Sequence, residues 1–70
     1  MEALEIRGMA TEEVRRKLDE THEELFNLRF QWSTRQLKDT NRLTQVRRDV
    51  ARLKTILRER ELAQLWEGQD

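Results

Sequence analysis

Two stripes of mainly hydrophobic residues at helical spacing organise the chain. Members of each stripe recur at alternating steps of four and three residues, which brings them to one side of an α-helix. The first stripe consists of Val14, Leu18, Thr21, Leu25, Leu28 and Trp32, with Thr21 as its polar interruption. The second consists of Leu43, Val46, Val50, Leu53 and Leu57, with Ile56 on its flank. The pattern predicts two amphipathic helices.

Local signals set the bounds of the first helix. Thr11 is the expected N-cap, and Glu12 and Glu13 follow in the first turn, where the helix dipole favours acids. We expect this helix at about 11–33. A short segment at 2–9 precedes it and contains a helical stretch that ends at Gly8, the expected C′ residue.

The stripe pattern is lost at 34–40, which predicts a loop. Asp39 or Thr40 is the expected cap of a second helix at about 41–62, and residues 63–70 are expected to form a flexible tail. A short connection lets two helices of similar length fold back side by side. The sequence thus predicts a single all-α domain over 1–70, an antiparallel, coiled-coil-like hairpin of two helices with a short N-terminal helical extension.

Composition narrows the possible functions. The chain has 70 residues, no cysteine and one histidine, so it offers no disulfide, no metal site and no evident nucleophile. It lacks a Gly-rich phosphate loop, and a hairpin offers no cavity for a small-molecule substrate. No apolar run is long enough to span a membrane. We therefore expect a cytoplasmic protein that is not an enzyme and needs no cofactor.

Charge is segregated along the chain although its net value is zero. Residues 1–28 carry eight acids and four bases, residues 29–60 carry three acids and ten bases, and residues 61–70 carry three acids. A concentration of positive charge of this kind is typical of a surface that binds a polyanion. The second helix holds much of it.

Helical projection places five of those bases on one broad side of the second helix, which runs from the shoulder of the hydrophobic stripe to the back of the helix. Arg47, Lys54 and Arg58 fall on one shoulder of the hydrophobic stripe. Arg48 and Arg52 fall on the back of the helix. Thr55 lies beside this second pair, whereas Asp49 lies on the opposite flank. A phosphate backbone would account for this arrangement, and a solvated charged surface is the alternative.

Two aromatic residues of the first helix lie off its stripe. Phe26 and Phe30 are either covered by the N-terminal segment or contacted by another molecule. Arg29 lies near the shoulder of the seam, where it either pairs with an acid across the hairpin or extends beyond it.

Several blocks, taken in order, resemble a known family. They are Glu23-Glu24-Leu25-Phe26-Asn27-Leu28-Arg29-Phe30-Gln31, Gln36-Leu37, Arg42, the run from Val46 to Arg52, and the run from Thr55 to Glu61. Together they are similar to the bacterial form of large-subunit ribosomal protein twenty-nine, over about residues 4–62. The resemblance implies a helical hairpin that binds large-subunit ribosomal RNA near the peptide exit tunnel. It also implies a neighbouring tunnel-rim protein as partner and a surface for nascent-chain factors.

The resemblance and the charge pattern together give a candidate RNA-binding set. Its members are Arg29, Gln31, Arg35, Gln36, Lys38, Arg42, Arg47, Arg48, Arg52, Lys54, Thr55 and Arg58. The chain departs from the family at three positions. Glycine is common at the position of Arg35, and proline is common near Asn41. Trp32 is larger than the usual residue and is expected to fill the loop end of the hairpin. The alternative function is a dimerising coiled coil that uses the same stripes without RNA.

Overall fold

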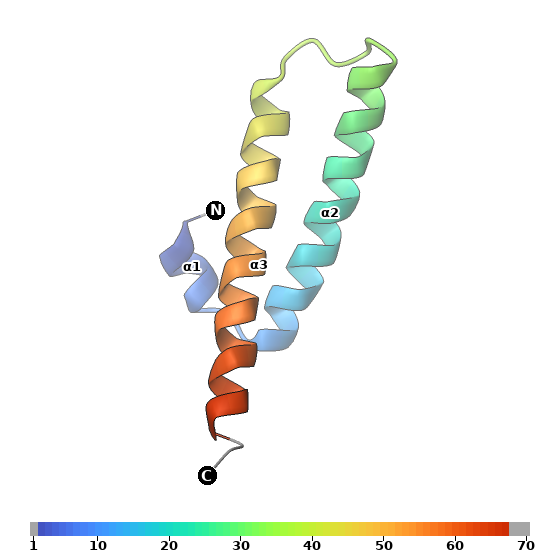
Figure 1. The fold of residues 1–70 in the computed structure, drawn as a ribbon. Coiled ribbons are helices and arrows are strands. Elements are labelled where there is room, and N and C mark those ends of the chain that lie inside the picture. The colour runs from blue at the N-terminus through green and yellow to red at the C-terminus, as the bar shows by residue number, and fades with distance from the viewer. Residues whose placement is uncertain (1, 68–70) are drawn as a thin grey trace.

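The computed structural model describes residues 2–67, which form three helices. They are α1 (Ala3–Arg7), α2 (Thr11–Ser33) and α3 (Asn41–Glu67). The two long helices lie antiparallel, joined by a loop at one end, and α1 lies along α3 near the other end (Figure 1). The molecule measures 53 × 19 × 15 Å along its principal axes. The all-helical hairpin with a short N-terminal helix is therefore confirmed.

Helix α3 is longer than the sequence pattern predicted. It ends at Glu67 rather than near residue 62, so residues 63–67, which we expected in a flexible tail, are helical. The stretch Ala63-Gln64-Leu65 consists of good helix formers, and the next glycine is Gly68. The remaining part of the expected tail, 68–70, lies outside the described residues.

The two predicted stripes face each other and form the seam of the hairpin. Near the loop, Leu25 packs with Val46 and Val50, and Leu28 and Leu43 lie against this cluster. Nearer the other end, Val14, Leu53 and Ile56 are buried together. Leu18 packs against both clusters and so joins them. The hydrophobic pattern therefore predicted the seam correctly.

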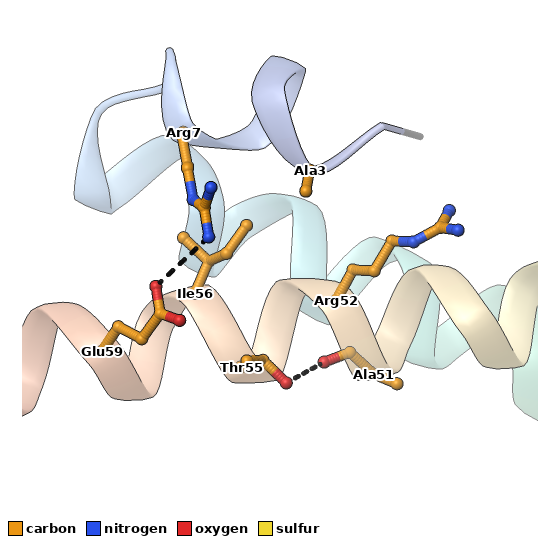
Figure 2. A pocket seen from close by; sticks show the side chains of 7 residues that line it. All are labelled: Ala3, Arg7, Ala51, Arg52, Thr55, Ile56 and Glu59. Carbon is orange, nitrogen blue, oxygen red and sulfur yellow. Dashed lines mark hydrogen bonds and ion pairs between the residues drawn. The ribbon is translucent and has the colours of Figure 1, made fainter.

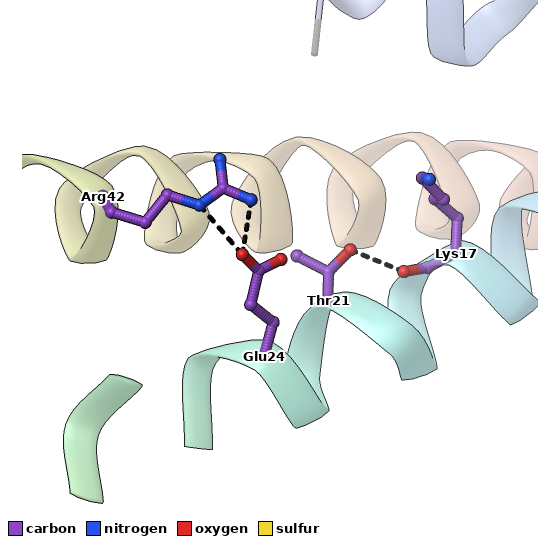
Figure 3. Close-up of polar contacts among 4 residues, drawn as sticks. All are labelled: Lys17, Thr21, Glu24 and Arg42. Atoms are coloured by element: carbon purple, nitrogen blue, oxygen red, sulfur yellow. Dashed lines mark hydrogen bonds and ion pairs between the residues drawn. The ribbon is translucent and has the colours of Figure 1, made fainter. Parts of the chain in front are cut away.

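The polar interruption of the first stripe is satisfied within its own helix. Thr21 is buried, and its hydroxyl donates a hydrogen bond of 2.6 Å to the carbonyl of Lys17 (Figure 3). A buried hydroxyl without a partner would be costly, whereas this bond to the preceding turn leaves only a methyl group to face the seam. Thr21 thus behaves as a small core residue.

Trp32 does not fill the loop end of the hairpin as we expected. Its side chain is 55% exposed and borders an open hollow with Ser33, Arg35 and Leu37. The cluster at this end is closed by Leu28 and Leu43, one turn before Trp32, so the seam ends before the tryptophan is reached.

Helix α1 adds to the core at the end of the hairpin opposite the loop. Ile6 is fully buried against Val14, Leu53 and Ile56. This position is far from the loop end of α2, so the N-terminal segment does not cover Phe26 and Phe30, which remain 71% and 59% exposed. The alternative in which this segment covers the two phenylalanines is therefore excluded.

A set of polar contacts fastens the N-terminal segment to α3. The Arg60 guanidinium donates to the Thr11 hydroxyl at 3.3 Å and to the Arg7 carbonyl at 3.2 Å. Arg7 in turn lies 3.9 Å from a Glu59 carboxylate oxygen. Thr11 was predicted to cap α2, but it is the first residue of the helix. The cap position is occupied by Ala10, which makes no side-chain hydrogen bond. The Thr11 hydroxyl accepts from Arg60 instead.

The backbone at the end of α2 forms a Schellman motif. The N–H groups of Gln36 and Arg35 donate to the carbonyls of Gln31 and Trp32, at 2.8 and 3.1 Å. Arg35 is the C′ residue and has a φ of 61°, the left-handed conformation that glycine adopts at least cost. Gly8, expected to use such a conformation, has a φ of −78° and does not need it.

The start of α3 follows the sequence prediction. The Asp39 carboxylate accepts the backbone N–H of Asn41 at 2.9 Å, which satisfies one of the free donors of the first turn. The Thr40 carbonyl accepts the N–H of Thr44 at 3.1 Å. Asp39 therefore supplies the capping side chain.

Replacing Arg35 with glycine should stabilise the hairpin. A non-glycine residue in the left-handed conformation is destabilised by about 1–2 kcal/mol, and Arg35→Gly removes this penalty. Part of the gain is lost because glycine has greater conformational freedom in the unfolded chain. We therefore expect a net increase of about 0.5–1 kcal/mol in the free energy of unfolding. Urea titration followed by circular dichroism measures it. Lys38→Gly, in the same loop but without a positive φ, should lower stability. A loss of stability in Arg35→Gly would contradict the assigned conformation.

Substitution by aspartate should destabilise the hairpin at one residue of α2 and have almost no effect at the next. Leu25→Asp places a charge in the seam between Val46 and Val50 and should abolish cooperative unfolding. Phe26→Asp changes an exposed position and should leave the helical signal and the unfolding midpoint nearly unchanged. Equal destabilisation by the two variants would mean that the seam is wrongly assigned.

Candidate nucleic-acid interface

One cationic surface is a groove between α2 and α3, here called the cationic groove. It is lined by Arg29, Arg47 and Lys54, together with His22, Leu25, Val50 and Ala51. Arg29 comes from α2, whereas Arg47 and Lys54 come from α3 on the shoulder predicted from the sequence. No acidic side chain lines the groove. Three cations thus share a cleft whose walls include the apolar edge of the seam.

The three cations of the groove have no carboxylate partner among residues 2–67. The ion pairs of this part of the chain involve other bases, namely Arg7, Arg15, Arg42, Arg52 and Arg58. The alternative in which Arg29 pairs with an acid across the hairpin is therefore excluded for the described residues. Their like charges repel one another in the free protein, and a bound polyanion would relieve that repulsion.

A second basic surface, the mixed face, lies on the other side of α3. It is lined by Arg42, Gln45, Arg48, Asp49 and Arg52. Asp49 lies 3.9 Å from Arg52, so the acid that we placed on the opposite flank from Arg47 in fact approaches one of the predicted RNA-binding residues. The spacing of three residues brings the two side chains to the same part of the helix surface.

Arg42 belongs to the mixed face but also joins the two helices. Its guanidinium donates through Nε and Nη2 to one carboxylate oxygen of Glu24 in α2, with an Nε–O distance of 2.9 Å (Figure 3). The pair is partly exposed, so it adds little to stability and mainly orients Arg42. Arg48 has no ion pair with residues 2–67.

Two further members of the candidate set have internal partners. Arg58 lies 4.0 Å from a Glu61 carboxylate oxygen, one turn further along α3. Thr55 donates its hydroxyl hydrogen to the Ala51 carbonyl at 2.8 Å and borders a hollow between α1 and α3 (Figure 2). The hollow also includes Ala3, Arg7, Ala51, Arg52, Ile56 and Glu59. Thr55 therefore lies with Arg52, away from the cationic groove.

The remaining candidates lie at the loop end of the hairpin. Gln31, Arg35, Gln36 and Lys38 are all exposed there. The Schellman motif holds this corner, since the Gln31 carbonyl accepts the N–H groups of both Gln36 and Leu37. The candidate set is thus divided into a groove, a mixed face and a loop corner, and it does not form one continuous patch.

His22 lines the groove, although from the sequence it was expected only as a surface or flank side chain of the first helix and not as a member of the RNA-binding set. It lies seven residues before Arg29 on α2, a separation of about two helical turns, which brings both side chains to one side of the helix. That spacing was a usable signal. Within residues 2–67 there is no cluster of three or more potential metal ligands. None of the described helices is long and apolar enough to cross a membrane.

The fold and these surfaces define a small helical-hairpin protein with a cationic groove and a second, mixed basic face, a class suited to binding. Comparison with known proteins then identifies the family. The family model of the ribosomal L29 protein matches residues 4–60. The chain belongs to this family.

Similar proteins share most of their length with this chain. The large ribosomal subunit protein uL29 of Natranaerobius thermophilus is 63% identical over 62 residues, which is 89% of this chain and 95% of the relative. The uL29 proteins of Geobacillus stearothermophilus and Moorella thermoacetica are each 59% identical, over 90% and 91% of this chain and 96% of each relative.

Proposed function

We propose that this chain is a structural constituent of the large ribosomal subunit that binds ribosomal RNA near the peptide exit tunnel. Membership of the ribosomal L29 family supports the structural, non-enzymatic role and a location in the cytoplasmic ribosome. RNA binding and the position at the exit tunnel are our inferences from the family resemblance and from the surface of the hairpin.

The observation that carries the proposal is the cationic groove. Arg29, Arg47 and Lys54 face a common cleft without an acid among its lining residues, although the chain as a whole has no net charge. Phosphates bound there would displace condensed counterions, which makes affinity fall as salt rises. The groove is therefore the expected main site for the RNA backbone.

The other two surfaces would add contacts of different kinds. Arg48 of the mixed face and Lys38 and Arg35 of the loop corner supply further phosphate contacts. Gln31 and Gln36 have exposed amide side chains that both donate and accept hydrogen bonds. Such groups suit the 2′-hydroxyls and phosphates of folded RNA, so recognition follows RNA shape more than base sequence.

The alternative of a dimerising coiled coil is less well supported. Leu25 and Val50, which belong to the two different stripes, are buried against each other's helices within one chain. The stripes are therefore already used in the hairpin seam. A dimer built on the same residues would require the hairpin to open.

A different surface is available for the neighbouring ribosomal protein. Phe26 and Phe30 are exposed on the outer side of α2, in line with Asp19 and Glu23 at helical spacing. Acids disfavour RNA at this surface, and aromatic residues are common in protein interfaces. We propose it as the contact with the tunnel-rim protein. A contribution to docking of nascent-chain factors follows only from the resemblance.

Charge reversal in the cationic groove should reduce incorporation of the chain into the large ribosomal subunit without unfolding the hairpin. Arg47→Glu with Lys54→Glu changes two exposed residues, so helicity should be retained while incorporation into large subunits falls at least about tenfold. Arg48→Glu with Arg52→Glu should also reduce incorporation. Quantitative mass spectrometry of purified subunits measures the chain relative to other subunit proteins. Arg15→Glu with Arg16→Glu makes the same change in net charge on α2 and should be incorporated normally. Normal incorporation of the groove variant would disprove the proposed site.

Salt dependence should separate groove residues from other cations. In binding of the free chain to large-subunit ribosomal RNA, Arg47→Gln should lower the slope of log affinity against log salt by about 0.7–0.9, the value for one phosphate contact. Arg15→Gln, which removes a base already paired with Glu12, should leave the slope unchanged. An unchanged slope in Arg47→Gln would remove Arg47 from the interface.

A further inference from the structure

Helix α3 continues beyond the body of the hairpin. Arg60 marks the level at which α2 begins, because its guanidinium binds Thr11. Leu57 is the last residue of α3 that packs against the core, and every residue from Leu62 to Glu67 is exposed. In Figure 1 this end of α3 extends past both α1 and α2. We call residues 62–67 the overhang.

The overhang carries three large apolar side chains on one side. Leu62, Leu65 and Trp66 are 43%, 62% and 73% exposed. Their spacing of three and four residues places them next to one another on the helix surface. Trp66 and the two leucines form an exposed apolar surface, and a bound partner would remove it from water. Tryptophan is also among the residues that contribute most to binding energy in protein interfaces.

The charge around this apolar surface restricts the partner. Residues 61–70 contain three acids and no lysine or arginine. Of the two nearest bases on α3, Arg60 binds Thr11 and the Arg7 carbonyl, whereas Arg58 pairs with Glu61 and offsets one of the three acids. Nucleic acid is disfavoured by this negative charge. A protein groove with an apolar floor and a rim of lysine or arginine is complementary in both respects.

We propose that the overhang is a docking helix for a protein partner whose apolar groove has a basic rim. Leu62, Leu65 and Trp66 would occupy the floor of that groove, and Glu61, on the flank of this apolar side at helical spacing, would face its rim. The matched family region ends at residue 60, so this surface lies outside the part of the chain that the family model covers. The proposal does not depend on RNA binding by the cationic groove.

Site-specific photo-crosslinking in living cells tests this proposal. Benzoylphenylalanine is introduced at position 66 of the full-length chain, and crosslinked peptides are identified by mass spectrometry. The expected product is a protein peptide with apolar residues and nearby lysine or arginine. Placing the same probe at Gln64, on the opposite side of the overhang, provides the matched control and should give a yield about tenfold lower.

A second variant checks that the apolar side chains carry the contact. Leu62→Gln with Leu65→Gln keeps the charge and good helix-forming residues, and it should lower the yield from position 66 at least about tenfold. Crosslinks to RNA, to an acidic peptide, or equally from positions 64 and 66 would overturn the proposal, as would the absence of any crosslink from position 66. Incorporation into the large subunit is measured separately, by mass spectrometry of purified subunits, so failure of this docking proposal and failure of the proposed function give different results.

Discussion

The seam between α2 and α3 is the contact on which the other surfaces of this molecule depend. Each long helix has one apolar stripe, and burial of Leu25 against Val46 and Val50 fixes how both helices are rotated. That rotation brings the shoulder of α2, with Arg29, beside the shoulder of α3, with Arg47 and Lys54. The cationic groove is therefore a product of the seam, because neither helix carries it alone.

This arrangement links binding to stability. The core is small, and the groove holds like charges without a carboxylate among its lining residues, so the free hairpin gains little from its polar surface. An anion that binds only the assembled groove stabilises the folded state by mass action. RNA binding and folding of the hairpin are thus expected to support each other. The ion pairs of the mixed face, such as Arg42 with Glu24, hold side chains in place but are exposed and contribute little.

Features set by residues close together in the sequence could be predicted, whereas features set by contacts between distant parts of the chain could not. The stripes repeat within a few residues, so the two long helices and their facing sides were predictable, and the cap of α3 was narrowed to Asp39 or Thr40. Thr11 was assigned wrongly because its hydroxyl accepts from Arg60, 49 residues away in the chain. The exposure of Trp32 depends on where the partner helix stops. Among the site residues, the shoulder position of Arg47 and Lys54 followed from local geometry, whereas their meeting with Arg29 and His22 required the fold.

The continuity of α3 ties the two proposed binding surfaces together geometrically. Lys54 in the groove and Trp66 in the overhang are twelve residues apart on one helix without an intervening break. At a rise of 1.5 Å per residue, they are about 18 Å apart along its axis. RNA in the groove and a protein on the overhang would therefore contact different parts of α3. Since the helix transmits its direction from one end to the other, fixing the groove on RNA would also fix the direction in which the overhang points.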